Sequence, residues 1–291
     1  MLHSIAGKKI ATFLGITLAI SAIFYYLIIS AGSLQANGGI YVLLLMWTPG
    51  VAAMITQLTY ERSLKGLGWK PGKFKYLALA YLIPLGYCLI VYGITWLTGL
   101  GNFPSPEFVN NLKISYPGLT SVTGSILVYS AAMATIGFIS SILSALGEEI
   151  GWRGLLVPEM AKVMPFTKVA FLSGLIWAAW HMPLIFFSDY NLPGLPTWYA
   201  GLMFLIMVMG ISFIFAWLRL KSGSLWTAVI LHASHNIFVQ AVFTPLTGQK
   251  PITPFIIDEF GCGLAIVAIG LAILFWRKRK DLPVENLQPA S

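Results

Sequence analysis

Three groups of polar residues interrupt long apolar stretches of this 291-residue chain. They are Glu148, Glu149 and Arg153 in the first group, His181 in the second, and His232 and Asn236 in the third. A charged side chain at the centre of a bilayer costs about 2.5 to 3.5 kcal/mol on insertion scales, so each group is a candidate for function. A carboxylate beside two imidazoles can move protons, activate a water molecule or bind a metal ion.

Helix geometry separates the two adjacent glutamates. Glu149 and Arg153 are four residues apart with the acid first, the order that favours an ion pair along a helix. Glu148 points about 100° away and gains no such partner from its own helix. We expect Arg153 to lie nearer the cytoplasmic end, where its long side chain can snorkel to the membrane surface. Glu148 is either a structural acid bonded to a neighbouring helix or a general base, and we favour the base.

Depth in the membrane decides whether the three groups can meet. His181 and the residues of the third group lie about 10 to 14 residues from the inner ends of their predicted spans, roughly 15 to 21 Å deep. Glu148 reaches a similar depth only if its helix continues to about Met160, although Pro158 favours a bend there. We therefore predict that this helix continues, which places the polar groups near the midplane on three helices.

Other conspicuous residues receive a structural interpretation. His235 lies on the other flank of the helix face formed by the third group, and we interpret it as an inter-helix hydrogen-bonding residue. Trp177 and Trp180 are at helical spacing and are interpreted as packing or interface aromatics. Asp258 and Glu259 come at the outer end of the last predicted span, where we expect solvation at the membrane interface.

The elements that position these residues are predicted to be membrane helices. The chain is 57% hydrophobic and 10% charged, whereas an ordinary soluble domain carries about 25% charged residues. About 20 apolar residues in a helix cross a bilayer core of about 30 Å. The sequence therefore predicts an all-α polytopic membrane protein with about eight spans. The expected spans are 10–31, 40–58, 76–97, one within 119–159, 167–187, 197–218, 225–243 and 256–276.

The basic residues predict the orientation of these spans. With the N-terminus in the cytoplasm, every lysine and arginine except Lys113, Lys250 and Arg153 falls in a cytoplasmic loop or at a cytoplasmic end. Both termini are thus predicted to be cytoplasmic, in the cell membrane if the source is prokaryotic. The net charge of +8 is spread over short loops beside the bilayer, which favours contact with lipid rather than binding to nucleic acid.

The three groups, in this order and on membrane helices, resemble the CPBP or Abi family of intramembrane endopeptidases. This family includes the type II CAAX prenyl endopeptidases. The motifs are Glu148-Glu149-x-x-x-Arg153, Trp177-x-x-x-His181 and His232-x-x-x-Asn236. The second motif commonly begins with Phe in the family and has Trp177 here. The resemblance implies a CAAX prenyl protease 2-like core, a cavity open to the cytoplasm, and hydrolysis of a peptide bond near the membrane.

On this basis the chain divides into three parts of one integral membrane domain. Residues 1–118 would supply three N-terminal helices, residues 119–245 the catalytic core, and residues 246–291 the last helix with a basic tail. In the core, Glu148 and His181 would activate a water molecule, while His232 and Asn236 would stabilise the oxyanion. Glu149 and Arg153 would support the site without transferring protons.

A metal-dependent mechanism uses the same residues differently. Glu148, His181 and His232 could bind Zn²⁺ as a two-His, one-carboxylate set with an open position for water. The sequence contains no His-Glu-x-x-His motif, so nothing local indicates zinc. We favour glutamate-activated water, and the zinc alternative stays open at the level of sequence.

Three functions are compatible with this pattern. The favoured one is an endopeptidase that acts on a membrane-associated protein or peptide. A prenylated CAAX tail and a peptide leader are two possible substrates. The second is a proton-coupled transporter in which Glu148, His181 and His232 form a relay, although the two halves show no repeated pattern of broken helices. The third is a non-catalytic membrane scaffold of the same fold.

Overall fold

The computed structural model describes residues 4–115, 118 and 121–283. Within these residues the regular secondary structure consists of helices, and there are no strands. Seven helices there are long and apolar enough to cross a membrane. They are α1 (Ile5–Ala31), Ala36–Glu61 with α2 (Ile40–Glu61), α3 (Phe74–Leu97), Val122–Ala161, α8 (Phe166–Phe187), α9 (Thr197–Ser222) and Trp226–Leu246. Short 3₁₀ turns lie at Ala36–Gly39, Lys65–Leu67, Thr253–Phe255 and Lys278–Asp281.

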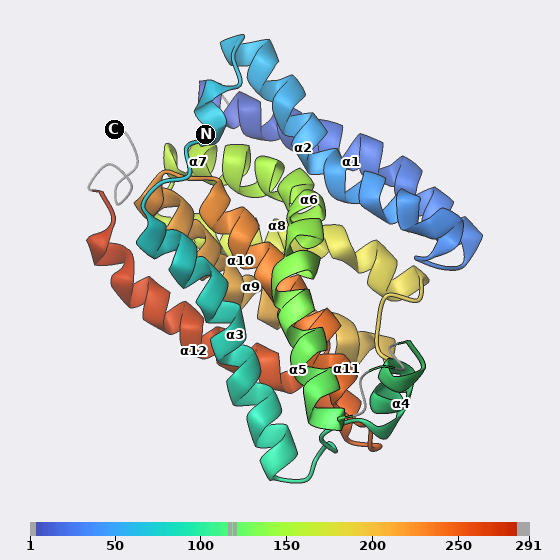
Figure 1. Ribbon diagram of the computed structural model, residues 1–291. Coiled ribbons are helices and arrows are strands. Elements are labelled where there is room, and N and C mark those ends of the chain that lie inside the picture. Colours follow the sequence, from blue (N-terminus) through green and yellow to red (C-terminus); the bar gives the residue numbers. More distant parts are fainter. Residues whose placement is uncertain (1–3, 116–117, 119–120, 284–291) are drawn as a thin grey trace.

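The last helix, α12 (Cys262–Arg277), is shorter than its predicted span. Its 16 residues extend about 24 Å, and it packs along α9 at the side of the bundle (Figure 1). The predicted start at residue 256 is wrong, because the chain from 256 to 261 turns inward before the helix begins. With α12 as the eighth helix, the prediction of an all-α polytopic membrane protein is confirmed. A further helix, α4 (Pro106–Ser115), follows α3 in the chain.

The helix that carries the first polar group is continuous through residue 161, as predicted. It comprises α5 (Val122–Ala132), α6 (Phe138–Glu149) and α7 (Val157–Ala161), joined by π-helical segments at Met133–Gly137 and Ile150–Leu156. The second π segment ends two residues before Pro158, which has no N–H to donate to an earlier turn. A wide turn thus takes the place of a break in the helix at this proline.

The helix that carries the third group repeats this arrangement. It begins as α10 (Trp226–Asn236), continues through a π-helical segment at Ile237–Phe243, and ends as α11 (Thr244–Leu246), which contains Pro245. The π segments at Ile150–Leu156 and Ile237–Phe243 each start directly after a polar residue that the sequence identified, Glu149 and Asn236. Such wide turns are frequent at functional sites, because they change the direction in which neighbouring side chains point.

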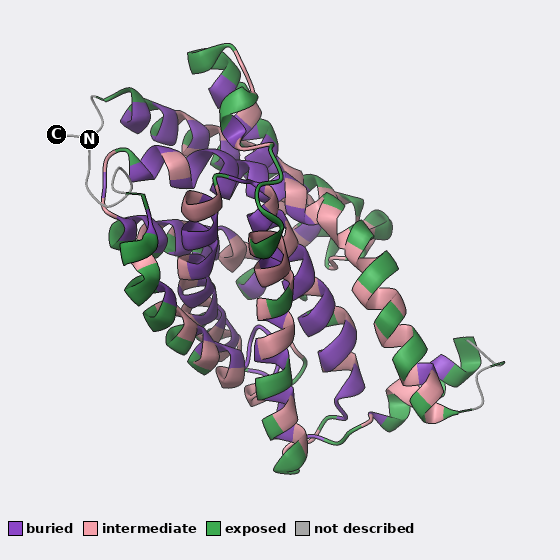
Figure 2. Cartoon of the chain, turned by 60° about the vertical axis from the view of Figure 1, so that its left-hand side comes forward, coloured by how far each residue is buried: buried purple, intermediate pink, exposed green. Residues whose placement is uncertain are grey.

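Glycines allow α2 to approach the helix of the first group closely. A Cβ atom at Gly147 would lie 2.9 Å from the backbone oxygen of Met46, and one at Gly151 would lie 2.5 Å from Cβ of Pro49. Small residues at such crossings let membrane helices pack backbone against backbone. Buried residues follow the inner helices, whereas the outer helices carry broad exposed faces (Figure 2). The close contact with α2 fixes the helix that presents Glu148.

Candidate active site

All four predicted catalytic residues line one cavity of about 370 Å³. Glu148 comes from α6, His181 from α8, and His232 and Asn236 from α10. Glu148 is 1% exposed and His232 is 5% exposed. The structure therefore brings together the residues that the sequence placed at similar depth on three helices. Glu149 and Arg153 lie outside the cavity lining, behind this layer.

Indole groups hold the carboxylate of Glu148. Its Oε2 accepts a 2.8 Å hydrogen bond from Nε1 of Trp177 on α8 and a 3.3 Å bond from Nε1 of Trp152, one turn along its own helix. Trp177 therefore does more than pack between helices, because its indole also positions Glu148. Its position four residues before His181, at the start of the second motif, was the signal that could have identified it.

The hydrogen bond of His181 determines which of its two ring nitrogens is free to accept a proton. Its Nδ1 lies 2.9 Å from the backbone oxygen of Trp177, which can only accept, so Nδ1 carries the proton. In the neutral ring Nε2 is then an unprotonated acceptor. The ring packs against Trp180 and Phe204, with centroid distances of 4.8 and 5.0 Å. His181 thus presents a basic nitrogen from a fixed ring.

A second layer links the first and third groups. Oε1 of Glu149 accepts a 2.8 Å bond from Nη1 of Arg153 and lies 2.9 Å from Nδ1 of His232. The ion pair between Glu149 and Arg153 that the spacing predicted is confirmed. Because a carboxylate oxygen only accepts, Nδ1 of His232 donates, and Glu149 orients both side chains.

Arg153 is held by aromatic faces. Its guanidinium carbon lies 4.1 Å from the ring centroid of Trp177 and 3.9 Å from that of Phe215, and the residue is 1% exposed. The expectation that Arg153 snorkels to the surface is wrong, because the cation is stacked between these rings and paired with Glu149. Within the described residues, Nε and Nη2 of Arg153 and Oε2 of Glu149 are buried without a hydrogen-bond partner.

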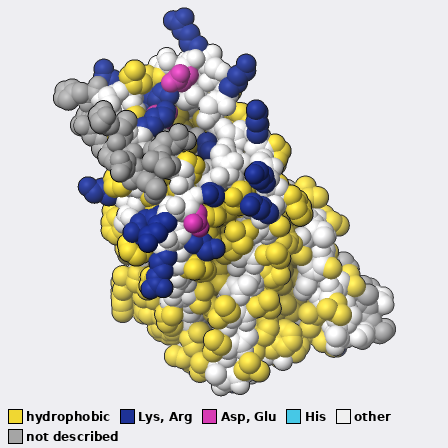
Figure 3. All heavy atoms as spheres, turned by 90° about the vertical axis from the view of Figure 1, so that its left-hand side faces the viewer, with side chains coloured by type: hydrophobic (Ala, Val, Ile, Leu, Met, Phe, Trp, Pro, Cys, Tyr) yellow, Lys and Arg dark blue, Asp and Glu magenta, His cyan; other side chains and the backbone are white. Residues whose placement is uncertain are grey.

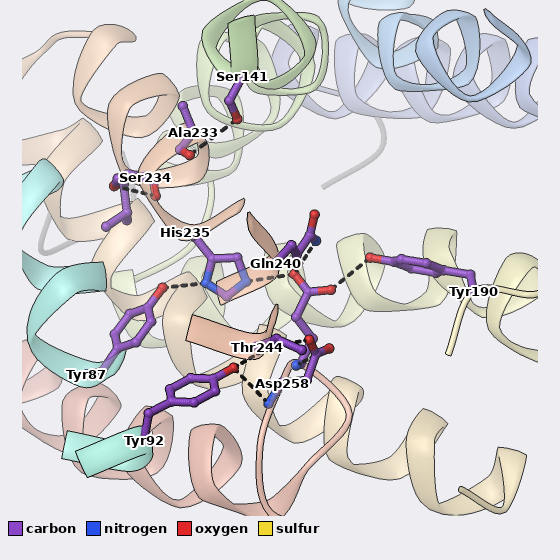
Figure 4. A network of polar contacts seen from close by, with 12 residues as sticks. Tyr87, Tyr92, Ser141, Tyr190, Ala233, Ser234, His235, Gln240, Thr244 and Asp258 are labelled. Carbon is purple, nitrogen blue, oxygen red and sulfur yellow. Dashed lines mark hydrogen bonds and ion pairs between the residues drawn. The ribbon is translucent and has the colours of Figure 1, made fainter. Parts of the chain in front are cut away.

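A further polar network forms another wall of the cavity (Figure 4). His235 lies between the hydroxyl of Tyr87 and Oε1 of Glu259, which is 2.8 Å from its Nε2. The same carboxylate accepts a 2.9 Å bond from Gln240 and a 3.0 Å bond from the hydroxyl of Tyr190. His235 is thus an inter-helix hydrogen-bonding residue, as interpreted, although it also lines the cavity.

The two acids before α12 are buried, contrary to expectation. Asp258 is 6% and Glu259 is 4% exposed, so solvation at the membrane interface does not explain them. Thr244 donates a 2.8 Å bond to Asp258, and burial together with the neighbouring Glu259 raises the pKa of Asp258 to about 7. Nothing in the sequence near these acids indicates that residues 256–261 turn inward, and their partners lie far away in the chain.

The described side chains do not form a metal site as they are placed. Within these residues, no group of three or more His, Cys, Asp or Glu side chains has an arrangement that could hold a metal ion. The Nε2 atoms of His181 and His232 are available as ligand atoms, but Glu148 is engaged by two indoles. We therefore derive no step through zinc.

Comparisons with known proteins agree with the motifs. Residues 130–238 match the model of the type II CAAX prenyl endopeptidase Rce1-like family. CAAX prenyl protease 2 of Methanococcus maripaludis is 33% identical over 100 residues, which cover 33% of this chain and 36% of that protein. The match thus spans about a third of the length of the curated relative. Residues 130–238 are thus similar to the Rce1-like type II CAAX prenyl endopeptidase family, which confirms the resemblance indicated by the three motifs.

Proposed function

We propose that this chain is an intramembrane endopeptidase that hydrolyses a peptide bond of a membrane-associated protein or peptide. The observation that carries the proposal is the shared cavity, which is lined by Glu148, His181, His232 and Asn236. Hydrolysis by an activated water requires a carboxylate, a basic imidazole nitrogen and further polar side chains around one cavity. The four residues supply these groups. The family match over residues 130–238 supports this reading.

The proposed nucleophile is a water molecule held between Glu148 and His181. Both groups present acceptors to the cavity, since Nδ1 of His181 is engaged by the oxygen of Trp177 and Nε2 is left to accept. Glu148 takes a proton as the water oxygen bonds to the scissile carbonyl carbon. The same proton then passes to the amide nitrogen as the C–N bond breaks.

The oxyanion would be stabilised by Asn236 and His232. The amide of Asn236 donates in any protonation state, but His232 already uses Nδ1–H toward Glu149. Its Nε2 can donate to an oxyanion only when the ring carries both protons. Glu149 is therefore a positioning residue that acts through His232, and Arg153 holds Glu149 in place.

The substrate class remains part of the proposal. The name of the archaeal relative, CAAX prenyl protease 2, refers to prenylated CAAX proteins, and a prenylated tail is one candidate substrate for this chain. The cavity wall combines many apolar side chains with a few polar ones, which fits an apolar peptide segment or a lipid-modified one.

Cleavage by purified protein tests the proposal against its two rivals. Wild type, Glu148→Gln and His181→Ala would be incubated in detergent with membrane-proximal peptides, including a farnesylated CAAX peptide, and the products identified by mass spectrometry. An endopeptidase gives two fragments with wild type and far less with either variant. A transporter or a scaffold gives no fragments, and fragments formed equally by all three proteins would point to a contaminating protease.

A further inference from the structure

Three helices meet at one corner of the bundle, where α3 begins and both α9 and α12 end. The 3₁₀ turn Lys278–Asp281 follows α12 at this corner. Lys221 of α9 donates a hydrogen bond to the backbone oxygen of Asp281, and the indole of Trp217 donates one of 2.9 Å to the backbone oxygen of Lys278. These bonds fix the end of α9 against the turn after α12.

A groove of about 520 Å³, here called the corner groove, opens between these helix ends. Its lining comes from the start of α3, the end of α9 and the turn after α12, and consists of Lys75, Tyr76, Leu79, Trp217, Lys221 and Asp281. Ligand sites have volumes of roughly 300 to 1,000 Å³, so a small ligand or a lipid headgroup fits this space. The corner groove shares no lining residue with the cavity that contains Glu148, and it is therefore a separate site.

Aromatic rings form the base of the corner groove. Trp217 is buried, and its ring packs edge-on against Tyr76 and Phe275, with centroid distances of 6.2 and 5.4 Å. Tryptophan and tyrosine favour the level of the lipid headgroups, because each combines an apolar ring with a group that forms hydrogen bonds. The base of the groove is thus held rigidly by α3 and α12 and suits the boundary between headgroups and acyl chains.

Three lysines surround this aromatic base. Nζ of Lys75 lies 5.0 Å from the ring centroid of Tyr76, and Nζ of Lys278 lies 6.0 Å from that of Trp217. Lys221 donates to a backbone oxygen, which carries no charge to neutralise it. Within the part of the chain that the structure describes, these three lysines form no ion pair. The site therefore carries positive charge that the described protein does not balance.

The electrostatics of the corner groove favour an anion. The carboxylate of Asp281 also lines the groove, but it opposes three ammonium groups, so the balance stays positive. The start of α3 adds to this balance, because the N-cap residue Lys73 supplies no side-chain acceptor for the N–H groups of the first turn. Anions are stabilised at such a helix N-terminus.

Apolar surface continues from the corner groove along the same helices. α3 and α12 carry exposed apolar side chains within about two turns of it, among them Leu82, Ile273 and Leu274. Figure 3 shows lysines and arginines gathered over one part of the visible face, beside a broad hydrophobic region. A ligand that satisfies both surfaces has a negatively charged head and long apolar chains.

We propose that the corner groove binds an anionic phospholipid. The phosphate lies among the ammonium groups of Lys75, Lys221 and Lys278, and the acyl chains follow the apolar faces of α3 and α12. Basic pockets between membrane helices recognise anionic headgroups by this combination of charge and apolar surface. A zwitterionic lipid brings a cation of its own to the lysines, and a soluble phosphate ester gains nothing from the apolar faces. The site needs neither the peptidase activity nor a particular orientation of the chain.

Native mass spectrometry of the purified chain in detergent tests the proposal. Phosphatidylglycerol and phosphatidylcholine with identical acyl chains are titrated separately, and the dissociation constant of the first bound lipid is measured. The groove variant combines Lys75→Gln with Lys221→Gln, which keeps a donor for the backbone oxygen of Asp281. The matched control combines Lys65→Gln with Lys168→Gln, two exposed lysines outside the groove lining. The unfolding temperature of each protein is recorded without added lipid.

We expect wild type to bind phosphatidylglycerol at least about tenfold more tightly than phosphatidylcholine. Each basic residue beside an anionic lipid contributes about fivefold in affinity, so the groove variant should bind phosphatidylglycerol roughly 30-fold more weakly. The control should stay within about threefold of wild type, because distant exposed charges are screened. Asp281→Asn removes the acid from the lining and should tighten binding by about two- to fivefold.

Three results would overturn the proposal. They are equal affinity for the two lipids, equal weakening in the groove variant and the control, and displacement of the lipid by an equal concentration of glycerol phosphate. The last result would identify the ligand as a soluble phosphate ester. If the groove variant unfolds at a lower temperature than wild type, Asp281→Asn decides, because tighter binding requires the anion to lie beside that carboxylate and unchanged binding contradicts the proposed site.

Discussion

The indole of Trp177 donates a 2.8 Å hydrogen bond to Glu148, and the backbone oxygen of the same residue accepts one from Nδ1 of His181. One residue on α8 thus sets both the carboxylate and the imidazole that would hold the nucleophilic water. The ring of Trp177 also covers the guanidinium of Arg153. The contact with Arg153 needs only an aromatic ring at this position, whereas the hydrogen bond to Glu148 needs the indole of Trp177.

Replacing Trp177 with Phe should separate these contributions. Trp177→Phe keeps the ring over Arg153 and the backbone bond to His181 but removes the 2.8 Å donor to Glu148. A hydrogen bond to a charged group contributes about 1.5 to 3 kcal/mol, so we expect kcat to fall by roughly tenfold or more. Trp180→Phe is the matched control, because its indole donates to Ser21 instead. Equal losses in the two variants would show that the donor to Glu148 is unimportant.

The protonation of His232 should shape the alkaline side of the pH–rate profile. Its Nε2 donates only while the ring is charged, because Nδ1–H is committed to Glu149. As the pH rises the ring loses a proton, Nε2 becomes an acceptor, and kcat should fall about tenfold per pH unit. In His232→Gln the side-chain amide donates at every pH, so we expect a lower rate without this alkaline decline. An unchanged alkaline decline in that variant would rule out His232 as its origin.

The pair of Glu149 and Arg153 should matter more for stability than the pair of Glu159 with the exposed Lys162. Arg153→Met leaves the Glu149 carboxylate buried without its cation, and breaking a buried pair costs about 3 to 5 kcal/mol. We expect the unfolding temperature in detergent to drop by roughly 6 °C or more. Lys162→Ala breaks the more exposed pair with Glu159 and should change it little. Similar shifts in both variants would contradict the structural role of Arg153.

Metal removal should leave the activity intact. Glu148 is held by indole donors, and the described residues contain no three-ligand group arranged to bind a metal. Dialysis against a strong chelator, checked by elemental analysis, should therefore change kcat by less than about twofold. A loss of activity that zinc restores would instead support the set of Glu148, His181 and His232 as ligands.

The sequence predicted the parts of the site that depend on helix periodicity. Glu149 and Arg153 pair because they are one turn apart, and Glu148 and His232 line one cavity because they lie at similar depth on their helices. Contacts that depend on side-chain direction between helices were not predictable in this way. The stacking of Arg153 between Trp177 and Phe215 and the inward turn that buries Glu259 are of this kind.

The central claim is that Glu148 activates the water that cleaves the peptide bond, and one rate constant tests it most directly. The measurement is the single-turnover cleavage rate of Glu148→Gln relative to wild type, with the unfolding temperature of both proteins recorded. General-base catalysis contributes about 10² to 10⁴-fold, so we predict a loss in that range with little change in unfolding temperature. A variant that is folded and cleaves at the wild-type rate would contradict the account.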